Sequence, residues 1–211
     1  MLILNKYLDM KFILWHSRPK GIIEVGAYTG KDWKLYDSVG VKNRCWIEAD
    51  PESFKILKAN VPETDVCINA PICEKDKPVQ FHVTSNFQSS SILNLKRHAE
   101  IYPQHKETGV IELQGRSLDS LVNEGKINMD LYDFLLMDVQ GAERFVLQGF
   151  KDNIHRIKSV VAEVNYTELY EGCMLIDEFD IYMEELGFKK IISTKHEVGL
   201  WGDAYYKRKC T

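Results

Sequence analysis

Short apolar runs alternate with amphipathic segments in the first third of the chain. Three runs are short enough to be buried strands, and they lie at residues 21–25, 45–47 and 65–69. Between them, residues 31–38 and 51–60 have apolar positions at helical spacing, and Asp50 is expected to cap the second helix, which begins at Pro51. Strands that alternate with helices at this spacing indicate βαβ units and a parallel sheet.

This alternation is interrupted between residues 71 and 115. Residues 79–83 and 110–113 alternate like half-buried strands, and residues 95–101 form a charged, helix-like stretch. We interpret the region 71–115 as an insertion at the edge of the sheet.

The alternation of strands and helices resumes in the last part of the chain. The pattern predicts strands at 134–138 and 160–164, helices at 142–150 and 175–186, and a closing pair of strands at 189–193 and 202–207. The expected fold is one doubly wound α/β domain over residues 21–211. Residues 1–20 are expected to hold an amphipathic helix that docks on this domain.

Composition and charge narrow the classes of protein. The 211 residues have a net charge of −4, with 45% hydrophobic and 27% charged residues, so a disordered chain is excluded and nucleic acid is disfavoured as a partner. The five cysteines include no Cys-x-x-Cys pair, and no apolar run approaches the ~20 residues that a membrane span needs. We therefore predict a cytoplasmic protein without a membrane span or zinc site, and leave its oligomeric state open.

The first candidate site is the turn after the first predicted strand, Glu24-Val25-Gly26-Ala27-Tyr28-Thr29-Gly30. Open parallel sheets bind ligands beyond the carboxyl ends of their strands, and glycine allows the backbone to approach a ligand closely. The spacing from Gly26 to Gly30 is not that of the dinucleotide fingerprint, and Glu24 suits a ligand with an amino group better than a diphosphate. The alternative interpretation is an ordinary tight βα turn.

The second candidate site follows the next two strands. A carboxylate at Glu48 is placed to accept both hydroxyls of a ribose; the alternative is the acidic first turn of a helix, but Glu48 precedes that helix and closes an apolar strand, which favours the ribose role. Asn69 and Ala70 end the third strand, where an adenine edge would lie, and Asn69 is alternatively a turn former.

Acidic residues also end two later strands. Asp138 closes the strand 134–138 and is followed by Gln140, while Glu163 closes the next strand. Together with Glu143 these carboxylates could hold a hard cation, but acids at strand ends more often cap helices or bind substrate hydroxyls, so no metal site is predicted.

The ordered set of motifs resembles the FkbM-type family of S-adenosylmethionine-dependent methyltransferases. The resemblance rests on segments spread over nearly the whole chain, namely 21–30, 46–51, 89–93, 118–121, 137–143, 163–165 and 201–204. It implies a class I, Rossmann-like methyltransferase fold, with S-adenosylmethionine as the cofactor. It also implies O-methylation, often of sugar or glycan hydroxyls. Relatives often carry His at the positions of Glu24 and Tyr28, so the substrate of this chain is expected to differ from theirs.

The resemblance suggests roles for the candidate residues. Glu24, Gly26, Ala27 and Gly30 would surround the methionine portion of the cofactor, Glu48 would bind its ribose, and Asn69 and Ala70 would lie near its adenine. Asp138 and Gln140 would face the point of methyl transfer. The candidates for the base that takes the acceptor proton are Asp138, Glu163 and His196.

Two other classes of protein stay open at this point. One is an NAD(P)-dependent oxidoreductase or epimerase. The missing glycine of the dinucleotide fingerprint and the lack of an evident Tyr-x-x-x-Lys pair argue against this class. The other is a non-catalytic carbohydrate-binding module, for which Tyr166, Tyr170, Trp201, Tyr205 and Tyr206 would supply a platform. The acceptor is expected to be a small molecule or a glycan.

Overall fold

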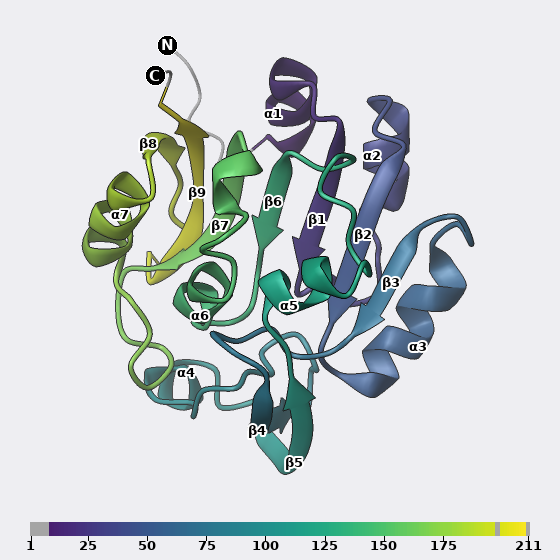
Figure 1. Ribbon diagram of the computed structural model, residues 1–211. Helices are drawn as coiled ribbons and strands as arrows, with labels where there is room; N and C mark the ends of the chain where they lie inside the picture. The colour runs from purple at the N-terminus through teal and green to yellow at the C-terminus, as the bar shows by residue number, and fades with distance from the viewer. Residues whose placement is uncertain (1–8, 197–198, 210–211) are drawn as a thin grey trace.

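A seven-stranded sheet forms the centre of the computed structural model, which describes residues 9–196 and 199–209 (Figure 1). Across the sheet, the strand order is β3 (Val66–Asn69), β2 (Asn43–Glu48), β1 (Gly21–Val25), β6 (Phe134–Met137), β7 (Ser159–Asn165), β9 (Trp201–Arg208) and β8 (Phe188–Ser193). The first five strands are parallel to their neighbours, whereas β9 runs antiparallel to both β7 and β8. The predicted mostly parallel, doubly wound sheet is confirmed.

Helices cover both faces of this sheet, because successive residues of a strand point to opposite sides. Ile22 packs with α1 (Met10–Ser17), α2 (Trp33–Ser38) and α3 (Pro51–Asn60) on one face. Its neighbour Ile23 belongs to the core on the other face. Helices on that face are α5 (Leu118–Asn123), α6 (Glu143–Gln148) and α7 (Ile176–Glu185), with the short 3-10 helix η1 (Ile154–Arg156).

Two helix starts show how the sequence sets local structure. Asp50 accepts a hydrogen bond from the backbone N–H of Ser53, with Pro51 in the first turn, so the predicted cap of α3 is present. Asp9 similarly caps α1, which buries Ile13 and Leu14 against the sheet. The first eight residues of the segment expected to dock lie outside the described residues. No helix in the described ranges is long and apolar enough to cross a membrane.

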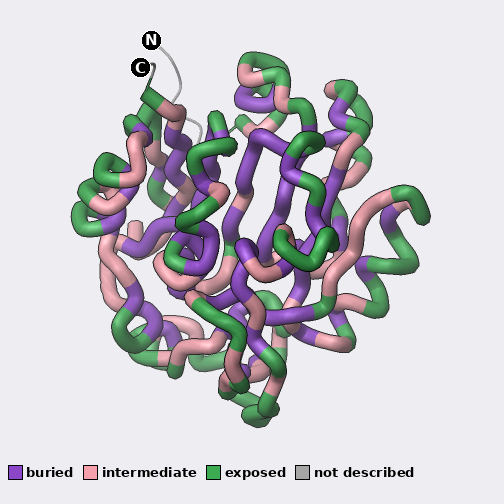
Figure 2. Tube along the Cα trace, viewed as in Figure 1, coloured by how far each residue is buried: buried purple, intermediate pink, exposed green. Residues whose placement is uncertain are grey.

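The insertion differs from its expected position at the edge of the sheet. Strands β4 (Lys77–Thr84) and β5 (Glu107–Gly115) pair only with each other in a separate antiparallel sheet. Figure 1 shows this pair and α4 (Arg97–Ile101) beneath the carboxyl ends of the parallel strands. Much of β5 is exposed, whereas the central strands are buried (Figure 2). The hairpin therefore adds a wall at the ligand end of the sheet.

Candidate active site

A cleft of about 500 Å³ opens at the carboxyl ends of β1, β2, β6 and β7. Strand order reverses between β1 and β6, and this switch point is where open α/β sheets bind their ligands. Three groups of residues surround the cleft. We call them the strand-end side (Glu24, Gly26, Ala27, Glu48, Ala70), the carboxyl cluster (Asp138, Glu143, Glu163, Asp203) and the ring cluster (His98, Tyr102, His105, Tyr170, His196, Trp201). All of these residues except Glu143 line the cleft.

The turn after β1 is shaped by Gly26. Its φ is +85°, and a Cβ at this position would lie 1.8 Å from the carbonyl oxygen of Asp138. Its N–H and that of Ala27 both donate to the carbonyl of Ile47, which ties the turn to the neighbouring strand. Only glycine fits here, and the turn presents Gly26 and Ala27 to the cleft.

Gly30 has a different role from its neighbours in the predicted site. It does not line the cleft, and a Cβ there would lie 2.6 Å from Val61 Cγ1 and 3.4 Å from Leu57 Cγ. Gly30 therefore lets the loop pack tightly against α3.

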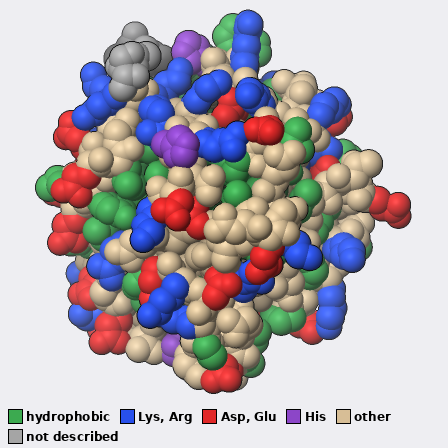
Figure 3. All heavy atoms as spheres, in the orientation of Figure 1, with side chains coloured by type: hydrophobic (Ala, Val, Ile, Leu, Met, Phe, Trp, Pro, Cys, Tyr) green, Lys and Arg blue, Asp and Glu red, His purple; other side chains and the backbone are tan. Residues whose placement is uncertain are grey.

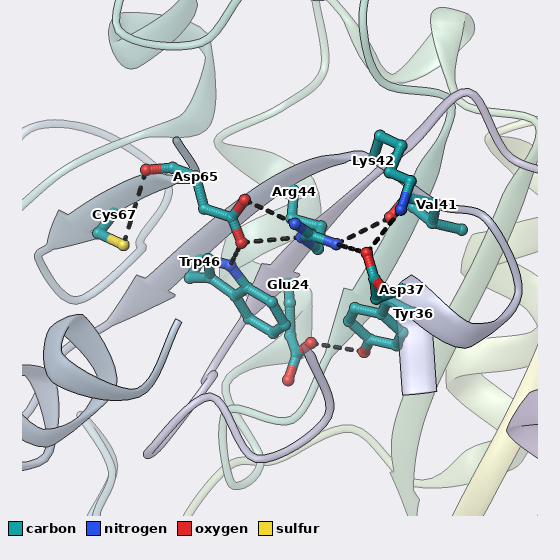
Figure 4. Close-up of polar contacts among 9 residues, drawn as sticks. All are labelled: Glu24, Tyr36, Asp37, Val41, Lys42, Arg44, Trp46, Asp65 and Cys67. Atoms are coloured by element: carbon teal, nitrogen blue, oxygen red, sulfur yellow. Dashed lines mark hydrogen bonds and ion pairs between the residues drawn. The ribbon is translucent and has the colours of Figure 1, made fainter. Parts of the chain in front are cut away.

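Glu24 is buried at the floor of the cleft. Burial raises the pKa of Glu24 to about 8, although the hydroxyl of Tyr36 donates to its Oε2 over 2.5 Å. Tyr36 in turn stacks on Trp46, with ring centroids 5.3 Å apart. Trp46 donates through Nε1 to Asp65, which also holds Arg44 through two hydrogen bonds (Figure 4). The orientation of Glu24 is thus set by a buried network that begins at the hydroxyl of Tyr36.

Glu48 ends β2 and accepts two backbone hydrogen bonds. The N–H of Tyr28 donates to Oε2 over 2.7 Å, and that of Asp50 donates to Oε1 over 2.8 Å. Burial raises its pKa to about 7, and these two hydrogen bonds oppose the shift. A carboxylate has about four acceptor positions, so two are free to accept hydroxyl groups of a ligand.

Asn69 and Ala70 separate at the end of β3. The amide of Asn69 donates to the backbone carbonyls of Glu48 and Ala49, the residue is exposed, and it does not line the cleft. Ala70 is buried and lines the cleft. The structure thus gives Asn69 the turn contacts that were its alternative interpretation.

The carboxyl cluster lies at the ends of β6, β7 and β9. Burial raises the pKa of all three carboxyls that line the cleft here. The pKa of Asp138 is raised, that of Glu163 is raised well above its ordinary value, and that of Asp203 is raised to about 6. Gln140 bridges two of them, because its Nε2 donates to Asp138 Oδ1 over 2.6 Å and to Glu163 Oε1 over 3.3 Å.

Glu143 stabilises the turn after β6. Its Oε1 accepts the N–H groups of Val139 and Gly141, and burial raises its pKa to about 7. Within the described ranges, no group of three or more His, Cys, Asp or Glu side chains is arranged to hold a metal ion.

The ring cluster was not recognised from the sequence as one unit. His98 lies within 6.0 Å, centroid to centroid, of Tyr102, His105 and Tyr170, and the indole of Trp201 donates to Tyr102 OH. His98 is 4% exposed and its Nδ1 has no hydrogen-bond partner among the described residues. Burial lowers the pKa of His98 to about 4, so its imidazole is neutral at neutral pH.

The candidate residues of the two final loops have different positions. His196, one of the candidate bases, lines the cleft with its ring stacked on Trp201, centroid to centroid 4.2 Å. Tyr205 and Tyr206 are buried in the core, and Tyr170 is buried where it lines the cleft, so these three residues do not form an exposed platform. The signal that the sequence did contain is the clustering of His and Tyr between residues 98 and 105.

The surface adds little to this picture. On the face drawn in Figure 3, Lys and Arg side chains are mixed with Asp and Glu. Acidic side chains are instead concentrated in the buried carboxyl cluster at the cleft.

A Rossmann-like sheet with a reversal point, a glycine turn and an acid at the end of the second strand is typical of α/β domains that bind a nucleotide cofactor, and the class I methyltransferase fold is one of these. The chain belongs to the FkbM methyltransferase domain family, whose model matches residues 24–190. The chain therefore carries a methyltransferase domain, and the family and fold indicate S-adenosylmethionine as its cofactor. The resemblance found in the sequence is therefore confirmed, and the oxidoreductase alternative is not supported.

Two known proteins illustrate the relationship. The chain is 26% identical over 161 residues to the 2-O-methyltransferase NoeI of Sinorhizobium fredii, an alignment that covers 72% of this chain and 65% of that protein. The structure of an O-methyltransferase from Bacillus cereus in complex with SAH aligns with a TM-score of 0.51 and 12% identity, covering 94% of this chain and 78% of that one. The second similarity shows the shared fold.

The residues present fit this cofactor. S-adenosylmethionine carries a positive sulfonium and an ammonium group, and the cleft floor presents the carboxyls of Glu24, Asp138 and Glu163. The free acceptor positions of Glu48 suit ribose hydroxyls. The cleft volume lies in the usual range for small-molecule sites.

Proposed function

We propose that this protein O-methylates a hydroxyl group of a sugar, a glycan or a related small molecule. The observation that carries the proposal is the position of the ring cluster beside the carboxyl cluster, in one cleft. Rings with polar edges can pack against the C–H faces of a sugar while bonding its hydroxyls. The relative named 2-O-methyltransferase NoeI supports the transfer to oxygen.

The strand-end side would hold the cofactor. Glu24, Gly26 and Ala27 would contact its methionine portion, Glu48 its ribose hydroxyls, and Ala70 the adenine. Asn69 would act indirectly, by fixing the backbone after Glu48. When bound, the cofactor supplies a methyl group on a positively charged sulfur.

Asp138 is the base that we assign to the acceptor hydroxyl. Its carboxylate lines the cleft, and the hydrogen bond from Gln140 favours its ionised form. Burial and the neighbouring carboxyls raise the pKa of Glu163 well above its ordinary value, which favours the protonated form that can donate a hydrogen bond. His196 stacks on Trp201 and would help to shape the acceptor side. Alignment of the acceptor by the ring cluster would add to the rate.

The direct test is methyl transfer from S-adenosylmethionine with a labelled methyl group. Neutral monosaccharides, oligosaccharides and phenols are offered in parallel, and the labelled product is located by mass spectrometry and NMR. We expect a methyl ether on a carbohydrate hydroxyl, with one S-adenosylhomocysteine formed per methyl. Transfer to a phenol, or to an amine, would contradict the proposed acceptor class but not the methyltransferase activity. Binding of carbohydrate without any transfer would favour the non-catalytic module.

A further inference from the structure

Gln140 occupies the centre of the cleft in an unusual conformation. Its φ is +56°, and its backbone carbonyl accepts a hydrogen bond from Ser91 Oγ over 2.8 Å. The side-chain amide contacts two carboxyls through Nε2, Asp138 at 2.6 Å and Glu163 at 3.3 Å. At its other end, Oε1 accepts the hydroxyl proton of Tyr170 over 2.6 Å. A non-glycine residue with positive φ is held by such surroundings at a cost, which points to a functional constraint.

The hydroxyl of Tyr170 decides which way the amide faces. It has one proton, and the oxygen of Gln140 at 2.6 Å is closer than the carbonyl of Ser89 at 3.2 Å. If that proton went to Ser89, no donor would hold the amide oxygen toward Tyr170, and the amide would be free to reverse and present its oxygen to Asp138 and Glu163. A carboxylate cannot donate to that oxygen, so the reversed amide is compatible only with protonated acids.

We propose that Tyr170 is a positioning residue for Asp138: by donating to Gln140 Oε1, it keeps Nε2 directed at the carboxyl cluster and so keeps Asp138 ionised toward the cleft. Tyr170 itself need not touch the cofactor or the acceptor. Burial raises the pKa of Tyr170 well above its ordinary value, so its hydroxyl keeps the proton that this role requires.

Several other groups also act on Asp138, and they come from different elements. The titratable and charged groups that face it are Glu24, Lys31, Asp32, Glu48, Glu143, Glu163, Tyr170 and Asp203. Burial raises the pKa of Asp138, and Asp32 adds to that, whereas Gln140 and Lys31 lower it. Gln140 is thus the hydrogen-bonding group that opposes the effect of burial.

The first experiment titrates Asp138 in the ligand-free protein. Its carboxyl ¹³C resonance is assigned by its loss in Asp138→Asn and followed against pH in wild type, Tyr170→Phe and Tyr166→Phe. We expect the midpoint to move to higher pH in Tyr170→Phe, because the amide is free to reverse. Tyr166→Phe is the matched control, since it loses a hydroxyl that donates to the carbonyl of Thr194 outside the cleft, and its midpoint should equal that of wild type.

The second experiment compares binding of S-adenosylmethionine and S-adenosylhomocysteine by titration calorimetry at several pH values. The two ligands differ in the positive charge on sulfur, so their affinity ratio reports the negative charge of the cleft. In Tyr170→Phe the ratio at neutral pH should fall about threefold to tenfold, as expected for the loss of one net hydrogen bond. If neither ligand bound to wild type, the proposed cofactor site would be wrong. The carboxyl titration uses no ligand, so it would still test the role of Tyr170.

An unchanged Asp138 midpoint in folded Tyr170→Phe would overturn the proposal. The double variant Tyr170→Phe/Gln140→Met should shift the midpoint no further than Gln140→Met alone, because both changes act through one amide. Additive shifts would show that Tyr170 acts independently of Gln140. If Tyr170→Phe does not fold, Gln140→Met tests the role of the amide by itself. An unchanged Asp138 midpoint in Gln140→Met would also overturn the proposal.

Discussion

The strand-end side and the ring cluster line the same cleft but are held together in different ways. On the strand-end side, the hydrogen bond from Tyr28 to Glu48 joins residues 20 positions apart, one in the turn after β1 and the other at the end of the neighbouring parallel strand β2. In the ring cluster, Tyr170 contacts Ser89 across 81 positions, and Trp201 contacts Tyr102 across 99. One side is therefore a property of two adjacent βα units, and the other depends on the whole fold.

The two sides also differ in how their polar groups are satisfied. Both oxygens of Glu48 accept backbone N–H groups, so this residue is in place before any ligand binds. His98, in contrast, is buried with an unpartnered Nδ1 among the described residues. A preformed side suits a constant cofactor, and a side with unsatisfied groups suits an acceptor that completes it. The predictions below test that contrast.

The largest effect is expected where the two sides meet, at Asp138. Asp138→Asn should lower the turnover number by about 100-fold or more, because a positioned base contributes that much, while the protein still folds. The matched control is Asp130→Asn, an exposed carboxyl whose loss should leave turnover unchanged. Turnover is measured by formation of S-adenosylhomocysteine, and folding by thermal melting. Full activity of Asp138→Asn would remove its assignment as the base.

The next largest effect concerns the backbone of the strand-end side. Gly26→Ala should lower the free energy of unfolding by about 2–4 kcal/mol, because the new Cβ meets the Asp138 carbonyl and φ is positive. Gly172→Ala is the control in the loop beside the ring cluster, with φ +70° but nothing within 4 Å of its Cβ, and should cost only about 1–2 kcal/mol. Denaturant unfolding measures both. Equal losses would mean that close approach adds nothing at Gly26.

The pH dependence of stability should have opposite signs for the two sides. The pKa of Glu24 is raised to about 8, so between about pH 4.5 and 8 the unfolded state binds fewer protons than the folded state, and stability falls as pH rises. The loss is at most about 1.4 kcal/mol for each pH unit in that window. Glu24→Gln should flatten this part of the profile. An equally steep profile in Glu24→Gln would assign the effect to other carboxyls.

Glu48 tests the strand-end side by ligand affinity. Glu48→Ala should weaken binding of S-adenosylmethionine by about tenfold, as expected for the loss of charge-assisted hydrogen bonds. Glu52→Ala, an exposed acid in the first turn of α3, is the control and should bind as wild type does. Calorimetry measures both affinities. An unchanged affinity in Glu48→Ala would refute its ribose role.

The smallest effect is expected at His98. His98→Phe should keep cofactor affinity unchanged and alter stability at pH 7 by no more than about 1 kcal/mol, because it removes a buried polar atom that has no partner in the described structure. The pKa of His98 is lowered to about 4, so between about pH 6.5 and 4 the unfolded state binds more protons than the folded state, and the free energy of unfolding decreases as the pH falls. His98→Phe lacks this titration and should therefore be more resistant to unfolding by acid. His16→Phe, on the surface helix α1, is the control. A large destabilisation of His98→Phe at pH 7 would show that the imidazole has a structural partner.

The sequence was sufficient for the sheet, because each strand and helix is encoded by its own periodicity. The cap at Asp50, the turn at Gly26 and the acid at Glu48 all depend on residues close in the chain. Helix α5 escaped prediction because its six residues are too few to show a helical periodicity, and only packing on the sheet makes its residues Leu118 and Leu121 a buried face.

Tertiary structure alone decided which candidates face the ligand. Asn69 and Gly30 match the motif as well as Ala70 and Gly26 do, yet the first two support the backbone and α3, and the last two line the cleft. The ring cluster and the bridge from Tyr170 through Gln140 to Asp138 are invisible in the sequence, since their members are brought together by strand order and by the insertion. Local patterns thus specified this protein's fold class and the strand-end side of the cleft, because hydrogen bonding between neighbouring βα units is short in range. The ring cluster and the environment of the carboxyls were set by burial and by contacts distant along the chain.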